Sequence, residues 1–412
     1  MKIVYLQDDF EPYGRGGAAA VVSNTAKATA KGGNEVCVIT TVQKESDSGT
    51  FHENGIRIER IYATPYEERW RAYRSLYNPE TVTAVEKILE EIKPDVIHAH
   101  NIHYYLSYYC LKIAKQSGAK VFLTAHDVML FHYGKLVEFI DPKNLSCPVK
   151  FNYRVTAWQQ LKKFRFRYNP FRNIIIKHYL KYVDKVFAVS NALKEALNQN
   201  EINNVEVVYN GIDIDNWQIN ASALNKFRDK YNLHDKKIVL FGGRLSSAKG
   251  GYQAISAMVE VIKKIPTAIL LIMGDKNEYT EKMIKIAEEK GIKGNLVFAG
   301  WISGDDLKSA YQVGDLLIMP SVCFDTFGMV CLEAMACKKP VIATCFGGAK
   351  EIVVDGMTGC TVNPFDINLL SGKMIDLLVN PAKAEKFGND GYERARSDFD
   401  LSVLIDKTIK FY

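Results

Sequence analysis

Residues 315–360 constrain the fold more than any other stretch of the sequence. They read DLLIMPSVCFDTFGMVCLEAMACKKPVIATCFGGAKEIVVDGMTGC. The apolar runs 315–321 and 340–344 have the length of buried strands, and helical spacing predicts a short helix over 328–337 between them. Apolar strands that alternate with helices favour a parallel α/β sheet, whose ligands bind at the carboxyl ends of the strands.

Two acids stand at this predicted ligand-binding edge. Asp325 lies in the loop before the helix, and Glu333 lies eight residues later, inside it. The free N–H groups at the start of the helix lie between them and suit an anion. A loop carboxylate, an anion pocket and a helix carboxylate would suit a sugar, a diphosphate and a ribose. The alternative is a plain strand–helix–strand unit with a solvated Asp and Glu.

The stretch from Asp325 to Glu333 resembles the E-x7-E signature of the retaining glycosyltransferases of family 4, which use a nucleotide sugar. That family usually begins the motif with Glu-Pro-Phe-Gly, whereas this chain has Asp-Thr-Phe-Gly, so its first acid is one methylene shorter. The following LEAMACKKPVIAT, GG and EIVVDGMTG fit closely. The resemblance implies that Asp325 holds sugar hydroxyls, that Glu333 holds the ribose, and that Phe327, Gly328 and Met329 bind substrate at the helix start.

A second motif opens the second half of the chain. An apolar strand over 237–241 is followed by GGRLSSAKG at 242–250 and then by a predicted helix. A glycine loop lets the backbone approach a phosphate, and Arg244 and Lys249 would neutralise it. The alternative is two solvated cations, but cations near a helix start oppose the helix dipole unless an anion is bound there. The motif resembles the family's G-R-L-x-x-x-K-G, which also places Gly243 against the donor.

The first half begins with a similar strand and glycine loop. A strand over 2–7 leads to a G-x-G-x-x-A match that starts at Gly14, which could indicate a dinucleotide site. The next predicted strand, 35–41, ends without an acid placed for a ribose. We therefore interpret Gly16 and Gly17 as a phosphate or sugar contact. A glycine turn needed only for backbone geometry is the alternative.

Histidines cluster at predicted strand ends in the first half. His98, His100 and His103 form H-x-H-x-x-H, but no acid-rich ligand set accompanies them, so we predict no metal. His126 follows the strand 120–124. The resemblance implies that His126 faces the donor sugar as a catalytic residue, together with Asp325, Arg244 and Lys249. The alternative is a strand-end histidine bonded to the backbone.

A chain of 412 residues suggests two domains. The resemblance implies the GT-B fold, in which two Rossmann-like doubly wound domains face each other across a cleft. We place an acceptor-side domain at 1–212, a nucleotide-sugar domain at 213–397, and a helix, 398–412, that packs back on the first. The D-x-D of residues 213–215 resembles the family's linker rather than a metal site. In the first domain we expect helices over 18–31, 79–92, 104–116 and 191–199.

The reaction that the resemblance implies is transfer of a hexosyl group, with retention, from a UDP- or GDP-sugar to a glycan or lipid-linked acceptor. No metal and no other cofactor is expected, and the family has no agreed protein nucleophile. A nucleotide-sugar epimerase of the same fold, or a transferase with a soluble acceptor, is the alternative. A phosphorylase would need a cofactor lysine that the sequence does not identify. A non-catalytic module would have lost the cationic clamp.

The net charge of +6 belongs entirely to the first half, and residues 150–185 carry ten cations against one acid. Because aromatic side chains are interleaved with these cations, we expect docking on an anionic membrane surface. A helix pair with buried aromatics is the alternative, and the sequence shows no nucleic-acid recognition fold. Absence of a signal peptide, of long apolar stretches and of C-x-x-C pairs predicts a cytoplasmic protein, peripheral on the inner face of the cell membrane. The aromatic residues are Trp158, Phe164, Phe166, Tyr168 and Phe171.

Overall fold

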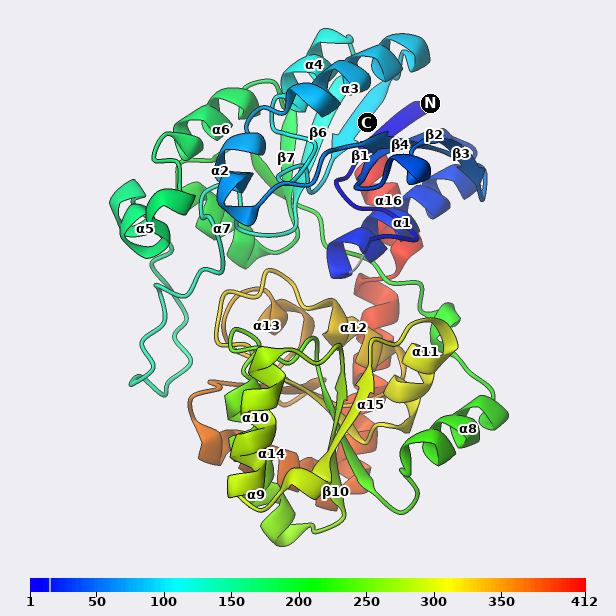
Figure 1. Ribbon diagram of the computed structural model, residues 1–412. Helices are drawn as coiled ribbons and strands as arrows, with labels where there is room; N and C mark the ends of the chain where they lie inside the picture. The colour runs from blue at the N-terminus through cyan, green and yellow to red at the C-terminus, as the bar shows by residue number, and fades with distance from the viewer. Residues whose placement is uncertain (15) are drawn as a thin grey trace. The chain divides into compact units, whose positions relative to one another are not determined.

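A computed structural model describes residues 1–14 and 16–412 and divides them into two compact units (Figure 1). Unit 1 comprises Met1–Lys135, Asn152–Gly211 and Leu401–Tyr412, and unit 2 comprises Leu136–Phe151 and Ile212–Asp400. Arg15, within the predicted glycine loop, lies outside the described residues. The expected division at 212 differs from this one chiefly in segment 136–151, which we had expected in the first domain.

Unit 1 is built on an eight-stranded sheet in the order β3-β4-β2-β1-β5-β6-β7-β8. Its strands pair in parallel except for β3, which runs antiparallel to β4 at the edge. The central strands are buried on both faces, which explains their continuous apolar sequences. The strands are β1 Lys2–Leu6, β2 Glu35–Val42, β3 Gly49–Glu53, β4 Ile56–Tyr62, β5 Val96–Ala99, β6 Lys120–Ala125, β7 Lys185–Ala188 and β8 Val205–Val207.

The helices of unit 1 flank this sheet, and the C-terminal helix α16 lies beside α1 (Figure 1). The helix expected over 104–116 begins only at Cys110, so that prediction was wrong by six residues. The difference has a tertiary cause, because the Asp8 carboxylate, in the loop after β1, accepts hydrogen bonds from the backbone N–H groups of residues 104–106. The helices are α1 Gly17–Lys31, α2 Arg71–Arg74, α3 Pro79–Ile92, α4 Cys110–Gln116, α5 Ala157–Phe164, α6 Arg172–Leu180, α7 Asn191–Gln199 and α16 Leu401–Ile409.

Unit 2 is built on a six-stranded, fully parallel sheet in the order β11-β10-β9-β12-β13-β14. Its core lies between the sheet and helices such as α9 and α14, which pack side by side. The strands are β9 Lys237–Phe241, β10 Ala268–Met273, β11 Leu296–Gly300, β12 Leu316–Met319, β13 Val341–Thr344 and β14 Gly359–Val362. The helices are α8 Ala221–Tyr231, α9 Gly251–Lys264, α10 Glu278–Glu289, α11 Gly304–Val313, α12 Met329–Ala336, α13 Ala349–Ile352, α14 Ile367–Val379 and α15 Pro381–Asp398.

Among the parallel strands of each sheet, the sequence order of neighbouring strands reverses once. This reversal point marks where a doubly wound sheet binds ligands. In unit 2 the reversal falls between β9 and β12, and in unit 1 it falls between β1 and β5. The loops after β9 and β12 carry the two motifs singled out in the second half of the sequence. The strand order therefore brings those motifs to one edge of the sheet.

Segment 136–151 belongs to unit 2 although it lies within the first half of the sequence. The Phe139 ring packs edge-on against Phe324 and Phe346, at centroid distances of 5.9 Å for each. The Phe324 N–H donates to the Leu136 carbonyl at 2.9 Å. The segment thus covers the loops after β12 and β13. Ring packing of this kind depends on residues almost 200 positions apart, which no local sequence pattern could indicate.

Among the helices that the structure describes, none combines the length and the apolar character that a bilayer crossing requires. None of the eight cysteines, all of which lie in the described part of the chain, forms a disulfide, and Cys147 is the exposed one among them.

Candidate active site

The glycine loop after β9 lies directly against the residues that follow β12. A Cβ atom at Gly250 would come within 1.9 Å of the Pro320 carbonyl oxygen, and the φ angle of Gly250 is +76°. Only glycine fits such an approach. The Val322 N–H donates to the Ala248 carbonyl at 3.0 Å and fixes the same contact. The two motifs, far apart in the chain, therefore form one site.

The centre of this site is an ion pair between Lys249 and Asp325. The Lys249 Nζ lies 2.5 Å from the Asp325 Oδ2, which also accepts a hydrogen bond from the Ser321 hydroxyl at 3.0 Å. Burial alone would lower the pKa of Lys249, but the Asp325 carboxylate raises it overall. Lys249 is therefore a firmly charged ammonium, held in place at the reversal point of the sheet.

Arg244 lies near the start of the glycine loop, whereas Lys249 lies near its end. The Arg244 side chain is exposed. Among the described residues no carboxylate forms an ion pair with it, so its guanidinium remains available for an anionic ligand. Gly243, directly before it, has a φ angle of +99°, which lets the backbone turn sharply there. The predicted clamp thus consists of one pre-paired cation and one solvated cation.

The start of α12 supplies backbone donors beside this clamp. Gly328 is the N-cap with a φ angle of +101°, and no side chain caps the helix. Its free N–H groups therefore suit a phosphate oxygen. Met329 is half-buried in the first turn, whereas Phe327 is buried against the Phe399 ring. With its ring buried, Phe327 would contribute to a ligand site through its backbone, and its predicted role in substrate binding stays a prediction.

Glu333 accepts a hydrogen bond from the Tyr311 hydroxyl of α11. Burial raises the pKa of Glu333, and the Tyr311 hydrogen bond opposes that rise. The Tyr311 ring in turn packs edge-on against Trp217 at 5.3 Å between centroids. The carboxylate that we predicted to hold a ribose is thus oriented by a tyrosine that no sequence pattern identified.

In unit 1, Gly16 and Gly17 lie exposed at the start of α1. Gly16 has a φ angle of +116° and is the N-cap, again without a capping side chain. The neighbouring loop is fixed by Asp8, whose buried carboxylate accepts the N–H groups of residues 104–106 at 2.7–2.9 Å. The contact with a phosphate or sugar at Gly16 and Gly17 stays a prediction, and Asp8 joins the loop after β1 to the loop after β5.

His126 lies in a cluster of buried histidines in unit 1. Its Nε2 lies 2.8 Å from the Nδ1 of His100, and the two rings stack. Burial lowers the pKa of His126 to about 4 and that of His98 to about 3, and neighbouring histidines add to both effects. Both ring nitrogens of His98 are hydrogen-bonded, one to the Tyr412 hydroxyl and one to Thr124. His98 therefore has no nitrogen free to bind a metal.

Two doubly wound sheets, with cations and an uncapped helix at the reversal point of the second, have the architecture of the GT-B fold. The family model described as glycosyltransferase family 4 matches residues 15–216, and the model described as glycosyl transferases group 1 matches residues 225–394. The chain belongs to these family 4 glycosyltransferases.

Individual relatives and structures agree with this assignment. An uncharacterized glycosyltransferase of Methanocaldococcus jannaschii is 26% identical over 100% of this chain and 98% of its own length. A GDP-mannose-dependent phosphatidylinositol monomannoside mannosyltransferase of Mycolicibacterium smegmatis is 32% identical, but over 44% of this chain and 49% of that enzyme. The sucrose-phosphate synthase of Thermosynechococcus elongatus shares the fold, with 22% identity, a TM-score of 0.76 and coverage of 100% and 98%. The Anabaena protein HepE, solved with UDP-glucose, has a TM-score of 0.72 at 20% identity, and both chains are covered completely.

Proposed function

We propose that this glycosyltransferase moves a hexosyl group from a UDP- or GDP-sugar to a lipid-linked glycan, with retention at the anomeric carbon and without a metal. The observation that carries the proposal is the combination of Lys249, Arg244 and the uncapped start of α12 at one sheet edge. The lysine, the arginine and the backbone N–H groups would together bind an anion there, and Asp325 and Glu333 offer carboxylates on either side. A nucleotide diphosphate sugar has complementary groups in the same order: a sugar for Asp325, a diphosphate for the cations and the helix start, and a ribose for Glu333.

In the proposed reaction the bond between the anomeric carbon and the diphosphate oxygen breaks, and a bond to an acceptor hydroxyl forms on the same face. The hydroxyl proton passes to the departing phosphate. The difficulty is the negative charge that develops on that phosphate. Arg244, Lys249 and the α12 N–H groups would stabilise it as preorganised donors. Because these cations already neutralise the diphosphate, the proposal needs no divalent ion.

A thermal-shift panel of UDP, GDP, ADP and their sugars tests the donor class, because a ligand that binds only the folded state raises its stability. Incubation with the stabilising sugar nucleotide, with and without a membrane extract, then tests the reaction. Transfer that requires the extract supports the proposal. Conversion of the donor to an epimer without any acceptor would instead establish the epimerase alternative.

Arg244→Ala should reduce turnover about 100-fold while the protein stays folded. Arg244 is exposed, so the fold does not depend on it, and the loss reflects a charge-assisted phosphate contact of roughly 2–4 kcal/mol in the transition state. Arg396→Ala, at another exposed position of unit 2, is the matched control and should leave turnover unchanged. Near-normal turnover of Arg244→Ala would contradict the proposed clamp.

The acceptor class rests on the surface of segment 150–185. Trp158 and Phe166 are exposed to 72% and 96%, and Phe171 and Ile174 also lie on the surface. Large exposed apolar side chains beside cations are suited to a lipid headgroup boundary. The structure also reduces the surface that the sequence predicted. Tyr168 and Arg172 are buried, and Phe164 packs edge-on against Tyr133, so these three do not take part.

The full-length protein should therefore co-sediment with vesicles that contain anionic lipid, and salt should weaken the binding. Reversing three charges, Lys162→Glu, Lys163→Glu and Arg165→Glu, should abolish it. The matched control reverses three exposed lysines of unit 2, at Lys282, Lys285 and Lys290, and should keep it. Equal loss in both triple variants would show a general charge effect, and no binding at any salt would favour a soluble acceptor.

A further inference from the structure

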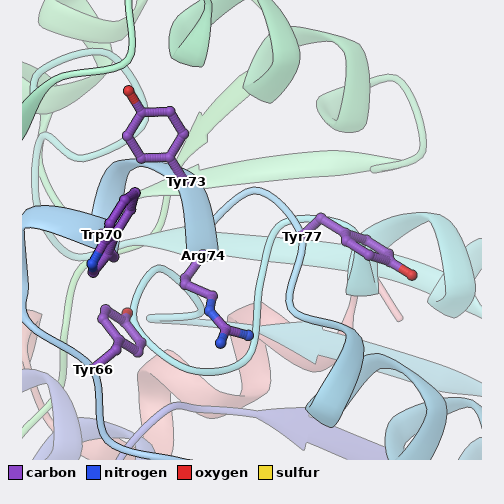
Figure 2. A pocket seen from close by; sticks show the side chains of 5 residues that line it. All are labelled: Tyr66, Trp70, Tyr73, Arg74 and Tyr77. Carbon is purple, nitrogen blue, oxygen red and sulfur yellow. The ribbon is translucent and has the colours of Figure 1, made fainter.

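A surface pocket in unit 1 lies outside every residue assigned above. Its volume is about 280 Å³, and it is lined by Tyr66, Trp70, Tyr73, Arg74 and Tyr77. In Figure 2 the Arg74 guanidinium lies between Tyr66 and Trp70 on one side and Tyr77 on the other. Trp70 is 50% exposed, and Tyr73 and Tyr77 are nearly as accessible. Soluble proteins seldom leave so many large rings together on the surface without a ligand.

The rings and the cation of this pocket are held in place by the fold. The Tyr66 ring packs on Tyr105 at 5.0 Å, and its hydroxyl donates to the Tyr104 carbonyl. The Tyr77 ring packs edge-on against Tyr109, also at 5.0 Å. These partners follow β5, so the pocket borders the reversal point of the unit 1 sheet. Rigid rings lose little conformational entropy when a ligand binds.

Arg74 adds a fixed polar group to the aromatic walls. Its Nη1 donates to the Asn78 Oδ1 at 3.0 Å, and its Nη2 lies 3.5 Å from the Glu80 Oε1. The guanidinium is half-buried and partly neutralised, so its remaining N–H groups suit hydroxyl oxygens better than a free phosphate. A fatty acyl chain would favour dry aliphatic walls, whereas every side chain that lines this pocket carries a polar group.

We infer that this pocket binds a pyranose ring of the acceptor glycan. A pyranose presents an apolar face of C–H groups that stacks on an aromatic ring, and a rim of hydroxyls that bonds to polar groups. A pocket with aromatic walls and a few convergent polar groups is complementary to that apolar face and that rim of hydroxyls. The inference rests on the proposed function, since it assigns part of the acceptor substrate to the unit that does not carry the donor site.

The position of the pocket also fits a glycan that is anchored in a lipid surface. The pocket segment contains the short helix Glu68–Trp70, and Glu68 forms an ion pair with Arg167 at 2.5 Å. Arg167 belongs to the basic segment 150–185, proposed above as the membrane contact. The saccharide pocket and the proposed lipid surface are therefore neighbours within one unit.

The test titrates the full-length protein, without vesicles, with maltotriose and with methyl glycosides of glucose, galactose, mannose and N-acetylglucosamine. Tryptophan fluorescence and saturation-transfer NMR report binding. We expect at least one saccharide to bind saturably, and Trp70→Ala to weaken that binding about tenfold. Trp70→Phe should restore part of it. Phe51→Ala, at an exposed aromatic residue of the same unit, is the matched control and should bind like the unaltered protein.

A parallel assay separates this inference from the proposed function. Hydrolysis of the sugar nucleotide by water needs no acceptor, so Trp70→Ala should keep it while the KM for a glycan acceptor rises. No saturable saccharide binding, or equal binding by Trp70→Ala, would overturn the inference. Displacement of the saccharide by bare UDP or GDP at this pocket would also overturn it. Saccharide binding that depends on Trp70 in a protein without any donor turnover would keep the pocket and reject the proposed reaction.

Discussion

Lys249→Met should strongly reduce sugar transfer and also destabilise unit 2 by about 2 kcal/mol. The replacement leaves the Asp325 carboxylate, which is almost fully buried, without the ammonium group that now faces it. The lysine side chain keeps 28% of its surface exposed, which is why we expect less than the full cost of a deeply buried pair. Turnover should fall about 100-fold because the diphosphate loses a preorganised cation.

A double-mutant cycle with Asp325→Asn separates the structural role from the chemical one. Asn removes the stranded charge, so Lys249→Met/Asp325→Asn should recover much of the stability that Lys249→Met loses, as measured by urea unfolding. Turnover should remain low in both. Asp325→Asn alone should suppress transfer while the affinity for bare UDP or GDP changes little, since Asp325 is proposed to hold the sugar. Recovery of turnover together with stability in the double variant would show that Lys249 is a structural residue.

Unit 1 should lose stability steeply as the pH falls from about 6 to about 5, by about 4 kcal/mol per pH unit. Burial lowers the pKa of His98 to about 3 and of His103 and His126 to about 4, and it lowers that of His100 as well. These histidines are neutral when folded and take up protons when unfolded, near their ordinary pKa. Their contribution is therefore complete above about pH 6.5 and is lost as the pH falls toward about 4.

The Asp8 carboxyl partly offsets the effect of these four histidines on the pH dependence of stability. Burial raises the pKa of Asp8 to about 7, although three backbone N–H groups oppose that rise. Asp8 therefore takes up one proton in the folded state over the same range. The net uptake on unfolding is then about three protons, four by the histidines less one by Asp8. Asp127, 3.3 Å from the His103 ring, raises the pKa of His103 but does not overcome its burial.

Hydrogen exchange measured at pH 7, 6 and 5 tests this prediction unit by unit. Peptides of unit 1 should lose protection, whereas peptides of unit 2 serve as the internal control, because His234 is the one histidine there and it is exposed. His100→Gln should make the pH dependence shallower by about one proton. Equal loss of protection in both units would show that the histidines are not responsible.

The fold could be predicted, and a candidate donor site proposed, largely because their signals are local. Buried parallel strands are written as continuous apolar runs, and the glycine loop and the acid pair lie directly after two of them. The strand order then brings the loops after β9 and β12 together. The sequence could not reveal that Lys249 binds Asp325, because a pairing across 76 positions depends on tertiary geometry.

The remaining differences arise where tertiary contacts override local patterns. The Phe327 ring packs edge-on against Phe399, a contact that the motif does not indicate. The expected helix over 104–116 starts late because Asp8 binds its backbone. The saccharide pocket was missed although four aromatic residues lie close together in 66–77, since aromatic spacing alone does not distinguish a core from a surface.

Segment 136–151 has a consequence for dissecting the enzyme. The chain passes between the two units at four places, after residues 135, 151, 211 and 400. Cutting the chain at the obvious linker near 211 would give a C-terminal half whose Phe324 and Phe346 lack their Phe139 cover. The N-terminal half would carry an unsupported loop and lack the helix after residue 400. A chimera that exchanges donor specificity between two relatives should therefore take residues 136–151 and the C-terminal half from the same parent.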